Sequence, residues 1–254
     1  MSILANITTG RDNRPPRLMI YGQEGVGKST FGANAPAPIF IQTEDGLGEI
    51  DCAKFPLAKS LTEVTNALQA LRDEDHSYQT VVIDSLDWLE RLIFDDICRA
   101  YGVRSIEKAD GGFGHGYILA ISHWRSILAL LDELRIKRNM AVILLAHAKV
   151  ERFEDPESSA YDRYSPRLHK TAAGLISEWA DAAMFATKRF RVQKETSGFN
   201  GERGIAAPIG AGGGDRILRT NCGPACMAKN RYNLPEEIPL SWQAFMGILM
   251  EAKK

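Results

Sequence analysis

One segment near the N-terminus has the residue types and spacing that bind a polyphosphate. It runs Gly22, Gln23, Glu24, Gly25, Val26, Gly27, Lys28, Ser29 and Thr30, and it fits the pattern G-x-x-x-x-G-K-[ST] without a mismatch. Glycines in such a loop let backbone N–H groups surround phosphate oxygens, and a following helix adds partial positive charge. We expect Lys28 to contact the β- and γ-phosphates and Ser29 to ligate Mg²⁺. The segment therefore predicts a site for ATP with Mg²⁺.

Carboxylates follow two apolar runs further along the chain. The run from Thr80 to Ile83 ends in Asp84, which is the pattern of a Walker B strand. We expect Asp84 to complete the Mg²⁺ shell, through a water molecule. Glu44 follows the shorter run Ile39–Ile41, and a carboxylate there could orient or deprotonate a water that attacks a phosphate. Asp45 is the alternative for that task.

Polar residues also close two later strands. His147 ends the most apolar run in the chain and could hydrogen-bond to a terminal phosphate. Lys229 and Arg231 are two residues apart at the end of a predicted edge strand, so both cations share one face. Residues 187–231 hold nine basic residues and three acidic ones, a charge of +6. This segment is therefore expected to face phosphates or an acidic neighbour.

The elements that position these residues alternate between strand and helix. Strands are predicted at 17–21, 39–41, 80–83, 141–146 and 182–187, with helices after the loop and at 61–75, 85–100, 171–179 and 241–252. A further long helix carries Ile118, Ile121, Trp124, Leu128, Leu131 and Leu134 near one face. This alternation predicts an α/β fold with a mostly parallel sheet flanked by helices. Residues 149–170 are predicted as a long polar loop, and the Gly-rich segment 188–231 as β-hairpins at the C-terminal edge. We expect an N-terminal arm, 1–16, and one domain, 17–254.

Composition excludes several classes of protein. The chain has 254 residues, of which 44% are hydrophobic and 25% charged, as in ordinary globular domains. Its net charge of −1 leaves no overall basic field, so nucleic-acid binding would need a local patch or a ligand. Without a signal-peptide core or a membrane-length apolar run, we expect a soluble cytoplasmic protein. The cysteines Cys52, Cys98, Cys222 and Cys226 are expected to be reduced and unconnected, with a zinc site at the last two as the alternative.

Five segments in this order resemble the motifs of phage-encoded nucleotide-binding proteins with a RecA-like P-loop NTPase core: GQEGVGKST, TEDG, VVIDS, LLAHAKV and AKNRYNLP. The resemblance covers about residues 17–250, and the family includes the Sak-group single-strand annealing proteins, which are related to the RecA/Rad recombinases. It implies a DNA-dependent ATPase in the host cell cytoplasm that binds single-stranded DNA and promotes strand annealing or homologous recombination. The alternatives are a P-loop kinase of a small molecule and a helicase-loader-type ATPase that acts on a protein partner.

The same resemblance implies roles for particular residues. Glu44 would activate water, and His147 would sense the γ-phosphate. Lys229 and Arg231 would reach the ATP of a neighbouring protomer, as in hexameric helicases of the DnaB type, so the protein would be a homo-oligomer, a ring or a filament with shared ATP sites. Loops at about 102–116 and 150–170 would bind the DNA, through Arg104, Lys108, Arg163, Tyr164, Arg167 and Lys170. A single-stranded-DNA-binding protein is a further expected partner.

Overall fold

The computed structural model describes residues 14–155, 159–196, 202–208 and 214–251, together with residues 4, 7, 9 and 10. Most of the predicted N-terminal arm, Ile3 included, lies outside the described residues. Of its other apolar residues, Leu4 and Ile7 are exposed.

Six parallel strands form the centre of the sheet in the described part of the chain. Their spatial order is β7 (Ala182–Lys188), β1 (Arg17–Gly22), β5 (Ala141–Phe153), β4 (Thr80–Asp84), β2 (Pro38–Gln42) and β3 (Ala53–Lys54). Leu18 to Tyr21 of β1 are fully buried. Burial on both faces is why these strands read as continuous apolar runs in the sequence. The strand order places β5 between the strand that precedes the glycine-rich loop and the strand that ends in Asp84.

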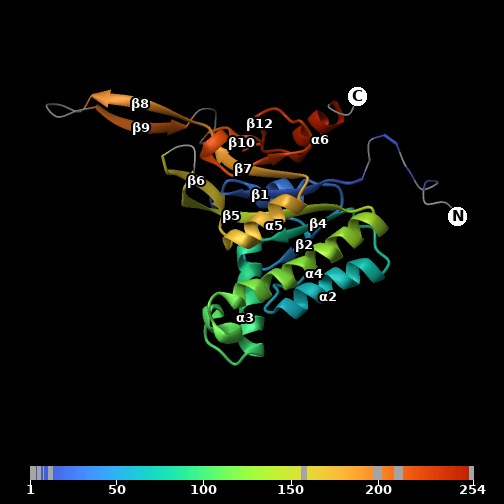
Figure 1. Ribbon diagram of the computed structural model, residues 1–254. Coiled ribbons are helices and arrows are strands. Elements are labelled where there is room, and N and C mark those ends of the chain that lie inside the picture. The colour runs from blue at the N-terminus through green and yellow to red at the C-terminus, as the bar shows by residue number, and fades with distance from the viewer. Residues whose placement is uncertain are drawn as a thin grey trace.

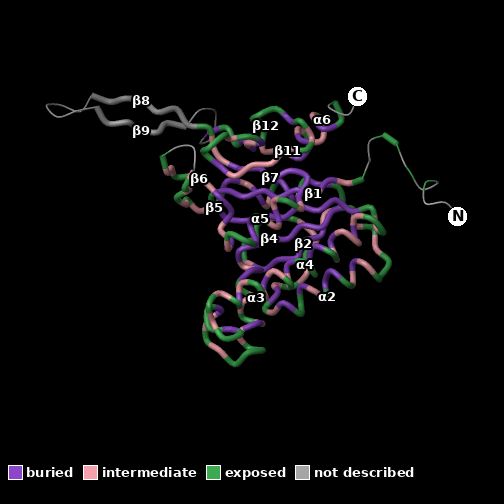
Figure 2. Tube along the Cα trace, viewed as in Figure 1, coloured by how far each residue is buried: buried purple, intermediate pink, exposed green. Residues whose placement is uncertain are grey.

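Helices cover both faces of this sheet (Figure 1). One face packs against α2 (Leu61–Asp73), α3 (Leu86–Ala100), α4 (His115–Lys137) and α5 (Lys170–Trp179). The other packs against α1 (Lys28–Ala33) and α6 (Trp242–Glu251). Alternate residues of β1 enter the two cores, Met19 and Tyr21 on the first side and Leu18 and Ile20 on the second. Figure 2 shows the buried residues concentrated in the sheet between these layers.

Local sequence signals account for where α2 begins. Ser60 accepts a hydrogen bond from the backbone N–H of Glu63 at 3.3 Å, and the Glu63 carboxylate accepts one from the N–H of Lys59 at 2.8 Å. Side chains thereby satisfy N–H groups at a helix end that have no intrahelical acceptor. Buried residues of α2 then recur at helical spacing, as at Val64, Leu68 and Leu71.

Antiparallel strands extend the sheet beyond β7 at its C-terminal edge. β10 (Arg216–Arg219) pairs with β7, β12 (Glu237–Pro239) pairs with β10, and the short β11 (Lys229–Asn230) also pairs with β7. β8 (Phe190–Thr196) and β9 (Glu202–Pro208) form a separate two-stranded sheet. The predicted α/β fold is therefore confirmed, with a mostly parallel sheet, flanking helices and β-hairpins near the C-terminus.

The prediction of a long polar loop at 149–170 is wrong. β5 continues to Phe153 and pairs antiparallel with β6 (Tyr161–Pro166), while residues 156–158 lie outside the described part. Cross-strand pairs hold this hairpin, notably Glu151 with Arg163 and Phe153 with Tyr161. Because the hairpin is polar and rises from the sheet, its sequence lacks the apolar alternation that marks a strand on a core.

Two smaller expectations also need correction. Ile118, expected on the apolar face of α4, is 67% exposed. Cys222 and Cys226 form a disulfide across the one-turn 3-10 helix Gly223–Ala225, instead of remaining unconnected thiols. Cys52 and Cys98 are free. Within the described residues, no group of three or more His, Cys, Asp or Glu side chains is placed to hold a metal ion. No described helix is both long and apolar enough to cross a membrane.

Candidate active site

The glycine-rich loop joins the end of β1 to the start of α1. A side chain at Gly22 would not fit, because a Cβ there would lie 2.3 Å from the carbonyl oxygen of Ala186 on β7. Gly27, the residue before α1, has a φ of 107°, a conformation that favours glycine. The loop therefore needs these glycines for close strand packing and for its turn into the helix.

Lys28 is buried although it carries the charge expected to meet phosphates. Its Nζ donates hydrogen bonds to the carbonyl oxygens of Gly22 at 3.1 Å and Gln23 at 3.0 Å. Burial lowers the pKa of this amine, although the negative charge of Asp84 opposes the shift. Main-chain oxygens thus hold the ammonium group inside the loop. A phosphate that enters the loop would replace these neutral carbonyl groups as the partner of the ammonium group.

The loop forms one wall of a cavity of about 400 Å³, within the usual range for small-molecule sites. Polar and charged side chains from β2, β4 and β5 or just beyond them line much of the rest, and Arg216 of β10 also lines it. The lining residues are Glu24, Gly25, Gly27, Lys28, Ser29, Thr30, Glu44, Gly46, Ile50, Asp84, His147 and Arg216. The carboxyl ends of β1, β2 and β4 therefore converge on one cavity with His147, which lies level with Gly22 on β5, as open α/β sheets predict.

Ser29 and Asp84 meet directly in this cavity. The Ser29 hydroxyl donates to Oδ2 of Asp84 at 2.6 Å. Burial raises the pKa of Asp84, while the hydrogen bond from Ser29 and the charge of Lys28 oppose the rise. Two hard oxygen donors on one side of a phosphate-binding loop are the donor set that Mg²⁺ prefers.

Glu44 is oriented by the residue that follows Asp84. The Ser85 hydroxyl donates to Oε2 of Glu44 at 3.1 Å. The adjacent Thr43 hydroxyl donates to the Ser85 carbonyl at 2.7 Å and accepts from the Ser85 N–H at 2.9 Å. These bonds fix the end of β2 against the end of β4. Asp45, the alternative water-activating residue, is exposed and does not line the cavity.

His147 is anchored by Asp87, a residue that the sequence did not single out. Its backbone N–H donates to Oδ1 of Asp87 at 3.1 Å, and its ring Nδ1 lies 3.0 Å from Oδ2. Burial alone would raise the pKa of Asp87, but hydrogen bonds from His147 and Arg167 outweigh it and hold that pKa well below its usual range. An ionised carboxylate only accepts, so Nδ1 carries the hydrogen that points to Asp87. A buried side chain in the first turn of α3 thus sets the orientation of the ring.

Arg167, predicted as a DNA contact, lies next to this site. Its Nη2 donates to Oδ2 of Asp87 at 2.9 Å, and its Nη1 lies 3.7 Å from the carboxylate of Glu24 in the loop. Arg167 directly follows β6, so one side chain connects the hairpin to the loop and, through Asp87, to His147.

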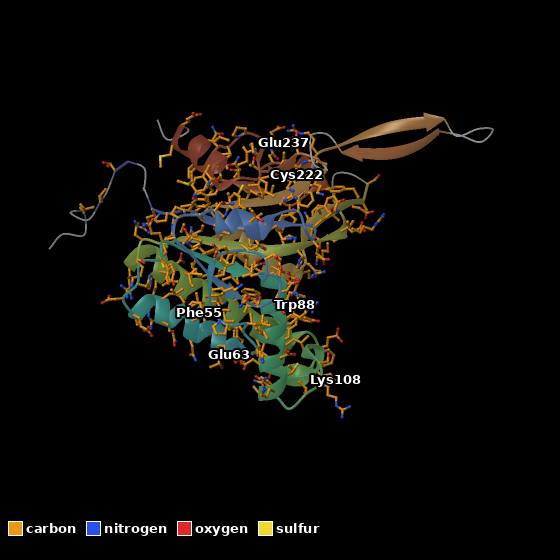
Figure 3. All side chains as sticks on the ribbon, turned by 180° about the vertical axis from the view of Figure 1, so that it is seen from behind. Phe55, Glu63, Trp88, Lys108, Cys222 and Glu237 are labelled. Carbon is orange, nitrogen blue, oxygen red and sulfur yellow. A yellow bond between two sulfur atoms is a disulfide. The ribbon has the colours of Figure 1, made fainter. Side chains whose placement is uncertain are left out.

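The other predicted DNA contacts lie apart from the cavity. Arg163 pairs with Glu151 at 3.1 Å and stacks on Phe153, and Tyr164 stacks on Phe185 at 4.7 Å in the half-buried part of the hairpin. Lys170 is exposed at the start of α5. Arg104 and Lys108 are exposed around the 3-10 helix Ile106–Gly111. Figure 3 shows Lys108 at the end of the molecule remote from Cys222 and Glu237.

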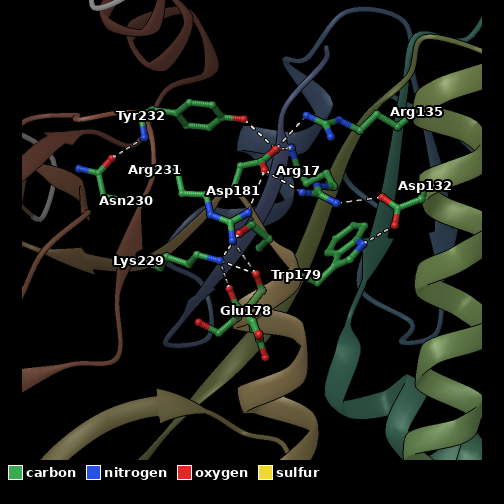
Figure 4. A network of polar contacts seen from close by, with 12 residues as sticks. Arg17, Asp132, Arg135, Glu178, Trp179, Asp181, Lys229, Asn230, Arg231 and Tyr232 are labelled. Atoms are coloured by element: carbon green, nitrogen blue, oxygen red, sulfur yellow. Dashed lines mark hydrogen bonds and ion pairs between the residues drawn. The ribbon is translucent and has the colours of Figure 1, made fainter. Parts of the chain in front are cut away.

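Lys229 and Arg231 lie at the amino ends of the parallel strands, whereas the glycine-rich loop of their own chain lies at the carboxyl ends. Lys229 Nζ donates to the carbonyl oxygens of Ser177, Glu178 and Ala180, at the end of α5. Arg231 lies 3.7 Å from Asp181, whose carboxylate also binds Arg17, Arg135 and Tyr232 (Figure 4). β1 runs from Arg17 at the amino end to Gly22 at the loop, a span of roughly 17 Å. The structure therefore does not bring these cations to their own cavity.

Sequence reasoning missed two residues of the site, Asp87 and Arg216. Asp87 lies inside a predicted helix, where an acid reads as a solvated residue. Arg216 belongs to the basic segment 187–231, in which no local pattern distinguishes it from its neighbours. The excess of positive charge there was the available signal.

The chain is similar to a family of domains, to a prophage-derived protein and to solved structures. A family model described as an AAA domain matches residues 14–232. The SPbeta prophage-derived uncharacterized protein YorG of Bacillus subtilis (strain 168) is 24% identical over 155 residues, which are 59% of this chain and 45% of that protein. The chain thus aligns with less than half the length of this relative. Among solved structures, a crystal structure of the RadB recombinase has 13% identity and a TM-score of 0.48, over 91% of this chain and 90% of that one.

Proposed function

Because this chain belongs to the AAA domain family, we propose that its P-loop ATPase site binds ATP with Mg²⁺ and hydrolyses it when single-stranded DNA is bound. The observation that carries this proposal is the convergence of Ser29, Asp84, Glu44 and His147 on the cavity beside Lys28. The prophage origin of one relative supports a phage role, in the cytoplasm of the host.

The side chains divide the chemistry between them. Lys28 and the backbone N–H groups of the loop bind the phosphates, and Ser29 with Asp84 would hold Mg²⁺, which neutralises phosphate charge. Glu44 orients the attacking water and accepts its proton, since Ser85 holds the carboxylate toward the cavity. His147 faces the terminal phosphate through Nε2, because Asp87 occupies the other side of the ring.

Single-stranded DNA is the proposed partner, and strand annealing or homologous recombination the proposed outcome. The chain is nearly neutral overall, so binding has to come from local cations summed over several copies. Arg104, Lys108 and Lys170 are exposed, and no ion-pair partner of theirs lies among the described residues. Arg167 supports coupling, because it lies between the hairpin and the loop that holds the nucleotide.

The test is the rate of ATP hydrolysis with and without single-stranded DNA, for the natural chain and for Lys28→Ala. We expect stimulation by DNA in the natural chain, and in the variant loss of nucleotide binding or turnover with an unchanged thermal unfolding curve. Hydrolysis that DNA does not alter, together with phosphate transfer to a small molecule, would favour a kinase. Normal turnover in folded Lys28→Ala would reject the site itself.

A further inference from the structure

Arg216, the first residue of β10, reaches the nucleotide cavity from the C-terminal edge of the sheet. It lines the cavity together with Gly27, Lys28 and Thr30. A Cβ on Gly27 would lie 3.0 Å from Nη1 of Arg216, so the guanidinium rests against the last glycine of the loop. An arginine from almost 190 residues further along the chain thus becomes part of the loop's surroundings.

This guanidinium has no acidic partner among the described residues, unlike the arginines near it. Arg189 pairs with Glu237 at 2.9 Å, and Arg219 pairs with the same carboxylate at 3.2 Å. The residue opposite Arg216 on β7 is Lys188, another cation. A positive charge placed beside a loop of inward N–H groups is unfavourable until an anion binds between them.

Arg216 contacts the loop at Gly27, whereas the carboxylates expected to act in hydrolysis contact Ser29 and His147. Asp84 bonds to Ser29, and Glu44 lies 3.7 Å from His147. In the described part of the chain, neither carboxylate lies within ion-pair distance of Arg216. Leu240 instead packs beside the arginine over Gly27, since its Cδ2 would lie 3.5 Å from a Cβ on that glycine. The guanidinium therefore lies over Gly27, at the turn into α1, and apart from the carboxylates that contact Ser29 and His147.

We propose that Arg216 binds the α- and β-phosphate part of the nucleotide from within the same chain, as a binding residue for ATP and ADP alike. This inference rests on the proposed ATPase function. A planar guanidinium can donate two parallel hydrogen bonds to phosphate oxygens, which an ammonium group cannot. An interaction made equally in the bound substrate and in the transition state lowers KM without changing kcat, as expected for a contact with phosphates that are not transferred.

The test compares Arg216→Ala and Arg216→Lys with Arg219→Ala, which removes a charge from the same strand without touching the cavity. Titration calorimetry measures affinity for ADP and for a slowly hydrolysed ATP analogue, and steady-state assays give kcat and KM. For Arg216→Ala we expect affinity for both nucleotides to fall at least about tenfold, with kcat within about twofold of the natural value. Arg216→Lys should recover only part of the affinity, and Arg219→Ala should bind normally.

Three results would overturn this proposal: unchanged affinity in Arg216→Ala, weakened binding of the ATP analogue but not of ADP, or a loss of kcat with normal KM. The fold should survive, since Arg216 is exposed and its side chain has no ion-pair partner in the described part; thermal unfolding checks this. Lys28→Ala distinguishes a failure of the role proposed for Arg216 from a failure of the proposed ATPase function. If Lys28→Ala abolishes nucleotide binding while Arg216→Ala does not alter it, this inference alone fails. If Lys28→Ala also binds normally, the proposed function fails.

Discussion

At the scale of single residues, Glu44 separates binding from hydrolysis. Its carboxylate lies in the cavity, held by Ser85, whereas the phosphates are cradled by the glycine-rich loop. We expect Glu44→Gln to bind ATP normally and to lose at least about a hundredfold in turnover, because an amide is a poor general base. Equilibrium binding and single-turnover hydrolysis measure the two effects. Asp45→Asn is the matched control, and a normal Glu44→Gln beside an inactive Asp45→Asn would move the role by one residue.

Glu90, one turn after Asp87 on α3, gives the protein a pH-dependent stability. It is 7% exposed and accepts hydrogen bonds from the N–H of His169 at 2.9 and 3.1 Å. Burial raises its pKa from 4.5 to about 7, against the opposing effect of the His169 bond. Between these values the folded chain keeps a proton that the unfolded chain has lost. Because of Glu90, the free energy of unfolding therefore falls as the pH rises from about 4.5 to 7. Above pH 7 this residue causes no further fall.

Replacing Glu90 by Gln should remove this slope, because the amide cannot ionise yet can still accept the His169 bond. At pH 8 the free energy of unfolding should rise by up to about 3 kcal/mol relative to the natural chain, and at pH 5 the two proteins should differ little. Urea unfolding at both pH values measures this, with exposed Glu107→Gln as the control. An equal effect at both pH values would show that burial does not perturb this carboxyl.

At the scale of elements, we expect the β5–β6 hairpin, with the start of α5 that follows it, to divide into two functional parts. Arg167 at its base contacts Asp87 and Glu24, whereas Arg163 and Lys170 do not line the cavity. We expect Arg167→Ala to lower the rate of ATP hydrolysis about tenfold, since His147 and the loop lose a shared anchor.

The double variant with Arg163→Ala and Lys170→Ala should instead weaken single-stranded DNA binding and flatten its salt dependence, with basal hydrolysis unchanged. Filter binding at several salt concentrations and ATPase assays distinguish the two. If both variants show the same defect, the division is wrong.

Features of the site that neighbouring residues encode can be predicted from the sequence, whereas contacts between distant residues cannot. The glycine-rich loop, the strand that ends in Asp84 and the central β5 are encoded by neighbouring residues, so periodicity and motif spacing locate them. The contacts of Asp87 with His147 and Arg167, and of Arg216 with Gly27, join residues 60 to 189 positions apart. Such contacts depend on strand order, which local patterns do not encode. The hairpin is hard to predict for a related reason, because its two strands pair with each other and most of their outer side chains are polar.

At the scale of the whole molecule, the sheet separates two sets of charged residues. The cavity lies at the carboxyl ends of the parallel strands, and the cluster around Asp181 lies at their amino ends. In a head-to-tail assembly, the carboxyl ends of the strands in one copy face the amino ends of the strands in the next copy. Repetition of this contact closes a ring or extends a filament. Arg231 could then act on a neighbour's nucleotide although it cannot reach its own.

This shared-site model predicts recovery of activity on mixing two inactive variants. Lys28→Ala lacks an intact loop, and Arg231→Ala lacks the cation, so in an equal mixture about a quarter of interfaces combine an intact loop with an intact arginine. Arg231→Ala should fold, because Arg17, Arg135 and Tyr232 still hold Asp181. The control mixes Lys28→Ala with Glu44→Gln, whose defects lie in the same half of the site, and it should recover nothing. ATPase assays over a range of ratios, with the mass of the assembly measured under ATP, decide the matter. No recovery at any ratio, together with a monomeric mass, would show that each chain hydrolyses ATP with its own residues alone.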